Sequence, residues 1–287
     1  MREHSVTLQS LGQPLVTARS AAIYAWPEQR ILKLFHASVN TAAARRERLN
    51  AAEAQALGAT EVCCFAEVEV EGRYGIVMSR LDGCTLTKST DANPLNLLRI
   101  PGTLARLQAR MHSAQTTQLQ DVREVIVELL EHSAMGFLSA AERAAVRAYI
   151  LALPEGLALL HMDFHTDNIL LSASGATVID WATAARGDAG ADLAMTCFLF
   201  NEAELFPGIT RFQAWLYNVL RKGIYRAYAR RYRALRGLSQ AEFEATIARW
   251  YLPALIFRLA SWQAPTEVQP LQAKIRQGIA RLPEVQA

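Results

Sequence analysis

The sequence predicts an α+β fold with two lobes, a small β-rich N-lobe and a larger, mainly helical C-lobe. Short apolar or alternating runs, typical of strands, dominate the first 80 residues. From about residue 95, apolar residues recur three to four positions apart, which is the period of an amphipathic helix. The pattern changes near residues 79–82, so we expect an N-lobe over residues 1–80 and a C-lobe over residues 81–287. A chain of 287 residues is long enough to bury a core in each lobe.

Four strands and one helix are expected in the N-lobe. The runs AAIYAW and RILKLFH flank PEQ and predict a hairpin. An Ala- and Arg-rich segment follows, with Asn40 or Thr41 as a cap and Gly58 as an end, and predicts a helix. The runs EVCCFAEVEV and YGIVMSRL, joined by the turn EGR, predict two more strands.

The C-lobe is expected to be helical except near residues 157–181. Three periodic segments precede that stretch, and the last places Ser139 and Glu142 in capping-box spacing. Residues 157–181 read as strand, turn and strand, and the chain after Asp188 is helical again.

Composition and charge exclude several classes of protein. Apolar residues make up 51% and charged residues 20%, which is typical of a globular protein. The formal net charge of +3 is too small to indicate a nucleic-acid partner. No apolar run approaches the roughly 18 residues of a membrane helix, and the N-terminus lacks a signal-peptide core. The four cysteines show no CxxC spacing. We therefore expect a cytoplasmic protein that binds neither nucleic acid nor membrane.

The segment LLHMDFHTDNILL, residues 159–171, places many polar side chains between two apolar runs. Asp163 and Asn168 lie in it, and Asp180 follows in TVIDWA. Phosphoryl transfer from a nucleotide needs positioning and charge neutralisation more than covalent chemistry. One carboxylate would orient the attacking hydroxyl, while an amide oxygen and a second carboxylate would hold a hard cation such as Mg²⁺. Asp163, Asn168 and Asp180 supply these three groups.

HxDxxxxN followed by ID and GDxxxDLA resembles the aminoglycoside phosphotransferase and choline kinase branch of the protein-kinase-like enzymes. The resemblance implies a two-lobed protein-kinase-like fold that transfers phosphate from ATP, or alternatively GTP, to a hydroxyl of a small molecule. It implies Asp163 as the catalytic residue and Asn168 and Asp180 as Mg²⁺ ligands. The acceptor is not identified, and a monomer or a homodimer is expected.

The resemblance also extends to nucleotide-binding residues in the N-lobe. Ser20 stands in the expected phosphate loop and Lys33 in the following strand, where it would contact the nucleotide phosphates. Glu53 matches the helix glutamate that pairs with this lysine, and Glu47 is a second candidate. Further along, YGIVMSRLDG is similar to the strand and hinge that meet the adenine ring, so the expected adenine contacts are Met78, Ser79 and Leu81.

Three polar residues are expected to support the catalytic loop: His161, Asp188 and Asp192. Met162 departs from the family pattern, which usually has a small residue, often Gly, between the histidine and the aspartate. We interpret it as a packing variation.

Two alternative functions remain open at this stage. One is a catalytically silent kinase-like protein that only binds nucleotide. The other is a zinc hydrolase using His161, Asp163 and His165, which alternate along a strand-like segment and so share a face. This second alternative leaves Lys33, Asn168 and Asp180 unexplained.

A basic run, RKGIYRAYARRYRALRG, lies on the same expected helix as an apolar stripe. The run could bind nucleic acid, lipid or an anionic substrate, but a solvated basic face is the favoured interpretation. The stripe consists of Phe212, Trp215, Leu216, Val219 and Leu220.

Overall fold

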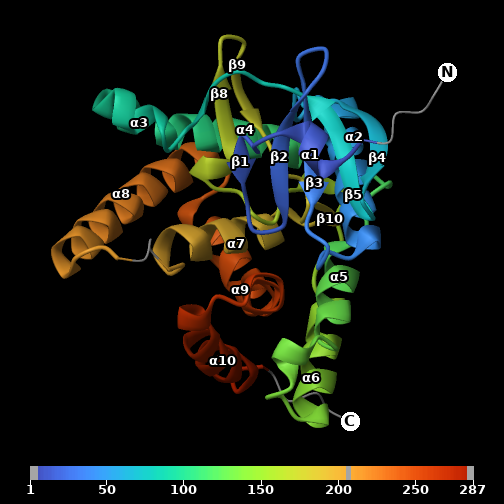
Figure 1. Cartoon of the computed structure of the whole chain (residues 1–287). Helices are drawn as coiled ribbons and strands as arrows, with labels where there is room; N and C mark the ends of the chain where they lie inside the picture. Colours follow the sequence, from blue (N-terminus) through green and yellow to red (C-terminus); the bar gives the residue numbers. More distant parts are fainter. Residues whose placement is uncertain (1–5, 205–207, 283–287) are drawn as a thin grey trace. The chain divides into compact units, whose positions relative to one another are not determined.

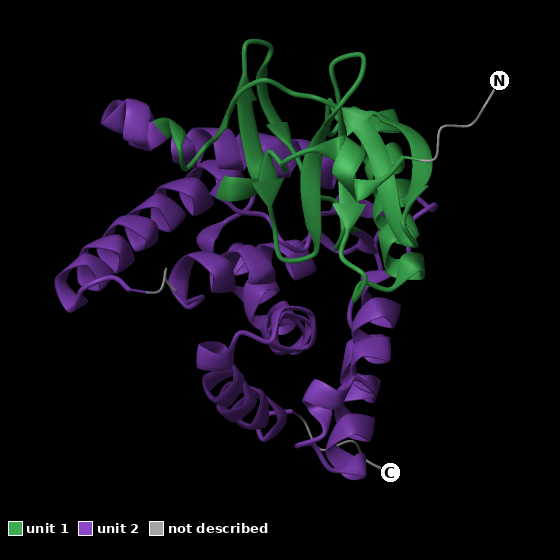
Figure 2. Ribbon diagram, viewed as in Figure 1, with its two compact units in different colours: residues 1–89, 167–184 green, residues 90–166, 185–287 purple. Residues whose placement is uncertain are grey.

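The computed structural model of the chain describes residues 6–204 and 208–282. The chain divides into two compact units, coloured green and purple in Figure 2. Unit 1 comprises Met1–Ser89 and Asp167–Ala184, and unit 2 comprises Thr90–Thr166 and Ala185–Ala287. These units do not coincide with the single boundary after residue 80 that the sequence suggested, because a later segment joins the first unit.

Unit 1 is built on a five-stranded antiparallel sheet with the strand order β1-β2-β3-β5-β4. The predicted hairpins AAIYAW–RILKLF and CFAEVEV–RYGIVMS are both present, and the predicted helix is α2, capped by Asn40. Figure 1 shows these elements in blue and cyan. Their bounds are α1 (Leu8–Leu11), β1 (Val16–Thr17), β2 (Ala21–Trp26), β3 (Arg30–Phe35), α2 (Thr41–Ala56), β4 (Cys64–Val70) and β5 (Arg73–Ser79).

The two faces of this sheet carry different clusters of apolar side chains. Leu32 and Leu34 of β3 point to one face, where they pack with Ala22, Tyr24 and Val77. Phe35 points to the other face, where α2 contributes Ala44. Because side chains alternate along a strand, Lys33 shares the face of Phe35 and therefore the side on which α2 packs.

A smaller sheet explains why residues 167–184 belong to unit 1. Its strand order is β6-β8-β9, with β6 (Cys84–Thr85), β8 (Ile169–Ser172) and β9 (Gly175–Val178). Thr60 donates its hydroxyl to the carbonyl of Val178 at 2.6 Å, and Thr177 accepts the backbone N–H of Glu61 at 2.9 Å. These hydrogen bonds, one of them buried, hold the β8–β9 hairpin against the loop that follows α2.

Unit 2 is mainly helical, with one two-stranded sheet of β7 and β10. The capping boxes of α6, α8 and α9 fix three helix starts, and the one predicted from Ser139 and Glu142 is confirmed. The short turns α3 (Ser89–Ala92), η1 (Pro94–Leu98), η2 (Ser133–Met135) and η3 (Thr166–Asn168) complete the chain. The other bounds are α4 (Ile100–Ser113), α5 (Val122–Leu129), α6 (Ala140–Leu151), β7 (Ala158–Leu160), β10 (Ala185–Gly187), α7 (Ala189–Asn201), α8 (Arg211–Arg236), α9 (Gln240–Trp262) and α10 (Pro265–Ile279).

None of the helices within residues 6–204 and 208–282 is both long enough and apolar enough to cross a membrane.

A buried ion pair joins α9 to α10 in unit 2. Arg258 donates from Nε and Nη2 to the carboxylate of Glu267 at 2.7 and 3.0 Å, and both side chains are less than a tenth exposed. The guanidinium also lies over the rings of Phe198 and Trp262. A buried charge is tolerated only when it is paired, so each member depends on the other.

We predict that Glu267→Ala lowers the free energy of unfolding by about 3 kcal/mol or more, because Arg258 would be left buried without a counter-charge. Urea unfolding monitored by circular dichroism measures this change. The exposed pair of Arg147 and Glu131 is the matched control, and Glu131→Ala should change stability by less than about 1 kcal/mol. If the free energy of unfolding falls equally in Glu267→Ala and Glu131→Ala, the structural role of the buried pair is contradicted.

Candidate functional site

Lys33 lies at the centre of a cluster of charged side chains in unit 1. It sits in the middle of β3, opposite Ile23 of β2 and Ile76 of β5. Its ammonium forms a short ion pair with the carboxylate of Glu47 on α2, and Nζ lies 3.2 Å from Oδ1 of Asp180. Two consecutive elements, β3 and α2, and a segment more than 130 residues later therefore converge on one positive charge.

The helix glutamate that pairs with Lys33 is Glu47, so the prediction of Glu53 for this role is wrong. The buried face of α2 is formed by Ala44, Glu47, Ala51 and Ala54, spaced by three and four residues. Glu53 lies six residues after Glu47, which is about 240° further around the helix, so it cannot share that face. Sequence reasoning chose the wrong one of two candidates because α2 lacks a strong apolar stripe to set its register.

Burial and the neighbouring charges act on Lys33 in opposite directions. Burial alone would lower the pKa of Lys33, but the carboxylates of Asp180 and Glu47 together raise it above its ordinary value. Burial raises the pKa of Glu47, and the charge of Asp180 adds to this effect, although Lys33 opposes it. Two carboxylates thus share one ammonium, and the cluster has an excess of negative charge when both are ionised.

Asp180 is the member of the cluster that faces solvent. Its side chain is 46% exposed, compared with 10% for Lys33 and 4% for Glu47. Its backbone is left-handed, with φ of 64°, a conformation that Asp adopts more readily than most residues. Exposed carboxylate oxygens beside a buried ammonium are available for a further cation.

Asn50 fixes the segment that follows Asp180. This buried residue donates from Nδ2 to the carbonyl oxygens of Trp181 at 3.0 Å and Ala184 at 3.2 Å. The sequence analysis missed it. The sequence did offer one indication of this role. Asn50 follows Glu47 by about one turn, on a helix face whose other buried residues are alanines.

Asn168 and Asp180 provide the oxygen atoms that a hard cation requires. Asn168 is buried just before β8. Its backbone carbonyl oxygen accepts the backbone N–H of Ile179, the residue before Asp180. An amide oxygen and an exposed carboxylate suit Mg²⁺, which takes few protein ligands and keeps several waters. The residues therefore fit a magnesium ion that is completed by oxygens of a ligand.

The expected nucleotide contacts of the sheet lie in the β1–β2 turn and at the end of the inner strand β5. Ser20 is in the tight turn between β1 and β2, where its carbonyl oxygen accepts the backbone N–H of His36 at 2.9 Å. Met78 is buried near the end of β5. The N–H of Ser79 donates to Cys63 and that of Arg80 donates to Gln29, so these two groups already have internal partners.

Asp163 belongs to unit 2 and lies next to two histidines. Its backbone N–H donates to Nδ1 of His161 at 3.3 Å, and its carboxylate lies 3.5 Å from Nε2 of His165. Burial would raise the pKa of Asp163, but the hydrogen bond and charge of His165 hold it below its ordinary value. Asp163 is therefore ionised at neutral pH and can accept a hydrogen bond from a hydroxyl.

Asp192 is the fully buried support of this loop. Its Oδ1 accepts the backbone N–H of Met162 at 2.7 Å, and its Oδ2 accepts hydrogen bonds from Gln108 at 2.9 Å and from His112 at 3.0 Å. Burial would raise the pKa of Asp192, but the hydrogen bond from His112 and its other partners hold it below the ordinary value. Two tyrosines of α8 extend the network, Tyr228 to Gln108 and Tyr232 to His112.

The backbone of Met162 adopts a conformation that favours a small residue. Its φ is 62°, in the left-handed region that costs most residues about 1 kcal/mol and that glycine adopts freely. The side chain is almost completely buried and its N–H is bonded to Asp192. Burial and this hydrogen bond offset the backbone strain.

Asp188 has a different structural role. Its side chain accepts the N–H of Gly190 at 2.9 Å and caps the N-terminus of α7. It therefore fixes the start of the helix that carries Asp192.

The zinc hypothesis for His161, Asp163 and His165 has no support in the geometry. Within residues 6–204 and 208–282, no three His, Cys, Asp or Glu side chains gather in an arrangement that could hold a metal ion. The contacts of these three residues with one another are those of a hydrogen-bonded loop.

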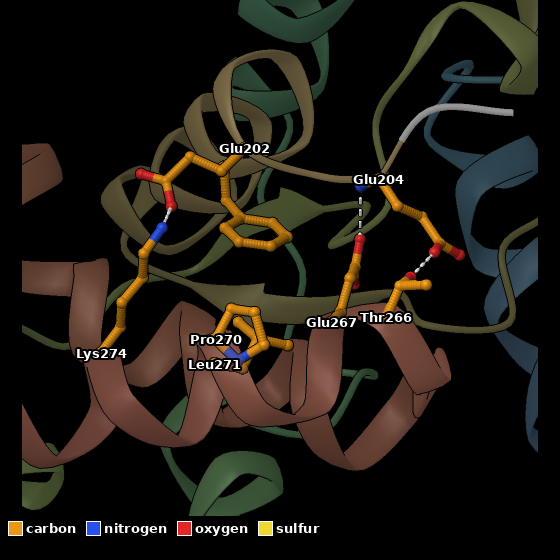
Figure 3. Close-up of a pocket in the computed structure, with 8 residues that line it drawn as sticks. Glu202, Glu204, Thr266, Glu267, Pro270, Leu271 and Lys274 are labelled. Atoms are coloured by element: carbon orange, nitrogen blue, oxygen red, sulfur yellow. Dashed lines mark hydrogen bonds and ion pairs between the residues drawn. The ribbon is translucent and has the colours of Figure 1, made fainter. Parts of the chain in front are cut away.

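A small pocket of about 130 Å³ in unit 2 is lined by Phe198, three glutamates and residues of α10 (Figure 3). Glu202 accepts from Lys274 and Tyr251, Glu204 accepts from Thr266, and Glu267 pairs with Arg258. The pocket is smaller than the roughly 300–1,000 Å³ of typical small-molecule sites. Its carboxylates serve the packing of α9 and α10, so it is not assigned as an acceptor site.

We predict that Asp192→Asn destabilises the protein at neutral pH by about 1–3 kcal/mol, because an amide cannot accept all three hydrogen bonds. The pKa of Asp192 is lowered by folding, so its ionisation contributes stability above pH 3.8, and that contribution is lost as the pH falls below 3.8. The gap between variant and wild type should therefore narrow in acid.

Urea unfolding at a series of pH values measures this gap. Asp188→Asn is the control, because asparagine caps helices about as well as aspartate and its stability should change little at any pH. If the difference in free energy of unfolding between wild type and Asp192→Asn stays the same from neutral pH to below pH 3.8, Asp192 is not ionised in the folded protein.

The family model described as "APH: Phosphotransferase enzyme family" matches residues 18–238, from the β1–β2 turn to just beyond α8. Sequence comparison with curated proteins finds no match.

Solved structures of similar fold include three aminoglycoside phosphotransferase complexes. A thermostable mutant of APH(4)-Ia with ADP and hygromycin B is 15% identical, with 93% of this chain and 92% of that chain covered and a TM-score of 0.62. The streptomycin–ATP complex of APH(2")-IIa is 13% identical, with 92% and 90% covered and a TM-score of 0.52. The GDP and kanamycin complex of APH(2")-IIia is 13% identical, with 94% and 91% covered and a TM-score of 0.52.

At these identities the likeness shows the fold alone, and it confirms the α+β, two-lobed protein-kinase-like fold class. The family match spans more than half of the chain and includes Lys33, Glu47, Asp163, Asn168, Asp180 and Asp192. The chain therefore belongs to the phosphotransferase enzyme family.

Proposed function

We propose that the protein is an ATP-dependent kinase, with GTP as the alternative donor, that phosphorylates a hydroxyl of a small molecule. The observation that carries this proposal is the cluster in which Lys33 is shared by Glu47 and Asp180. Protein-kinase-like phosphotransfer requires a strand lysine paired with a helix glutamate and, next to them, an aspartate for the metal ion.

Lys33 is proposed to bind the phosphates of the nucleotide. A buried ammonium whose pKa is raised keeps its charge at neutral pH, and Glu47 holds it in place from the helix side. Ser20 in the β1–β2 turn is proposed to contact the phosphates, and Met78 and Leu81 the adenine. Nucleotides in the structures of similar fold support a nucleotide as one substrate.

Asn168 and Asp180 are proposed to hold Mg²⁺ together with the nucleotide phosphates. The ion supplies positive charge that neutralises the phosphate oxygens. Asp180 has both the exposure and the excess negative charge that such an ion requires. Asn168 immediately precedes β8, which pairs with β9, and its backbone carbonyl oxygen accepts the N–H of Ile179, the residue before Asp180.

Asp163 is proposed to orient the acceptor hydroxyl. Its lowered pKa makes it a weak base, so its main contribution is a hydrogen bond that directs a lone pair of the hydroxyl oxygen at the phosphorus atom. It takes the proton as the new O–P bond forms, while the bond from the γ-phosphorus to the bridging oxygen breaks and the nucleoside diphosphate leaves. Asp192, through the N–H of Met162, holds the backbone of this loop.

We predict that Glu47→Ala weakens nucleotide binding roughly ten- to hundredfold, which corresponds to the loss of one hydrogen bond to a charged group. Without Glu47, Lys33 would pair with Asp180 alone and would no longer be directed at the phosphates. Isothermal titration with an ATP analogue measures the affinity. Glu53→Ala, on another side of the same helix, is the matched control and should change it less than about twofold. The reverse ranking would mean that the register of α2 is wrong.

We predict that Asp163→Asn reduces turnover by roughly a hundredfold or more and leaves nucleotide affinity nearly unchanged. The measurement is ADP release with a panel of aminoglycosides, macrolides, choline, sugars and amino alcohols as acceptors. If the wild-type protein binds nucleotide but phosphorylates none of these acceptors, the catalytically silent alternative is favoured. Near-normal turnover of the variant would exclude Asp163 as the residue that orients the hydroxyl.

A further inference from the structure

The N-terminal half of α8 exposes its apolar side chains to solvent. Five of them recur at intervals of three and four residues and therefore lie on one face of the helix. They are Phe212, Trp215, Leu216, Val219 and Leu220, and they are 37% to 69% exposed. We call this set the outer stripe. The rings of Phe212 and Trp215 stack, with centroids 5.9 Å apart.

The opposite face of α8 is tied to the body of unit 2. Ala214, Asn218, Arg221 and Tyr225 are less exposed, recur at intervals of three and four, and fall on the side away from the outer stripe. Arg221 donates to the carbonyl oxygens of Ala203 and Asn201 near the end of α7. The helix rotation is therefore fixed, and the outer stripe points away from the protein. Figure 1 shows α8 as the long orange helix at the left of the view.

Basic residues continue the face that the outer stripe begins. Arg226 and Arg230 follow the last residue of the outer stripe by about two and three turns. They lie on the same side of the helix and are exposed. Lys222 lies on its flank. In all, α8 has eight arginines and lysines and no aspartate or glutamate, although acidic residues outnumber basic ones in the rest of the chain.

We propose that α8 docks the protein on the surface of a bilayer that contains anionic lipids. An amphipathic helix with aromatic and leucine side chains on one face and a basic polar region lies in the membrane interface, where its apolar face enters the acyl boundary and its basic groups meet the headgroups. The outer stripe is borne by one projecting helix, and a bilayer accommodates such a convex surface without needing a complementary groove.

A second copy of the chain is a poorer fit for this surface. Two outer stripes in contact would bring the basic residues of both helices together, and α8 has no acidic residue to offset them. An anionic bilayer has an apolar interior and negatively charged headgroups. It therefore complements an exposed apolar face that is flanked only by basic residues.

Flotation with lipid vesicles tests this proposal. Wild-type protein should float with phosphatidylcholine vesicles that contain about 30% phosphatidylglycerol, should bind pure phosphatidylcholine much less, and should lose binding as salt is raised. Leu216→Gln/Leu220→Gln should reduce binding at least about tenfold, because it removes two inserted side chains. Arg226→Gln/Arg230→Gln should reduce binding about fivefold for each charge removed.

Matched variants distinguish vesicle binding through α8 from non-specific binding through other exposed leucines or basic residues. Leu49→Gln/Leu151→Gln alters two leucines of similar exposure on α2 and α6, and Arg46→Gln/Lys88→Gln removes two exposed charges outside α8. Both should bind vesicles like the wild type, and all four variants should retain nucleotide affinity, which shows that they are folded.

The proposal is overturned if wild-type protein does not float with anionic vesicles, or if the control variants lose binding as much as the α8 variants. A dimer in sedimentation equilibrium that Leu216→Gln/Leu220→Gln dissociates, without vesicle binding by the wild type, would assign the outer stripe to a second copy instead.

Discussion

The buried ammonium of Lys33 is the charge on which the proposed nucleotide site depends. A lysine in the middle of a sheet can stay charged only if carboxylates replace the water it has lost. Glu47 comes from α2 and Asp180 from the segment after β9, so one charge ties together the sheet, the helix and the β8–β9 hairpin. Because two carboxylates serve one ammonium, the cluster is left short of positive charge, and a nucleotide-bound metal ion can supply it.

Unit 2 also contains a buried charge that its partners stabilise, and here the charge is negative. The carboxylate of Asp192 is completely buried and is stabilised by donors from α4 and from the backbone of Met162. The strained backbone of Met162 persists because its N–H has this partner. Each unit thus holds its own candidate residues through one buried charge, Lys33 in unit 1 and Asp192 in unit 2.

The sequence alone was enough to predict the fold class, whereas the roles of the site residues stay predictions. Strand alternation and turn residues located the sheet, and the spacing of Asp163, Asn168 and Asp180 pointed to phosphotransfer. Glu47 was ranked below Glu53 because helix rotation depends on packing against β3, and an alanine-rich helix carries little periodic signal. Asn50 and His112 were missed because their partners lie 80 or more residues away. The exposure of the stripe on α8 could not be predicted, because periodicity identifies an apolar face but not what covers it.

Calorimetric titration of Mg²⁺, with and without a non-hydrolysable ATP analogue, tests most directly whether the Lys33 cluster is a nucleotide and metal site. Mg²⁺ takes few protein ligands, so its affinity should be weak alone and should rise sharply when nucleotide supplies phosphate oxygens. Asp180→Ala should abolish this coupling while the fold, checked by circular dichroism, is retained. Asn168→Ala should weaken the coupling less, because an amide oxygen carries no net charge. Coupling that survives intact in Asp180→Ala would contradict the assignment of this cluster.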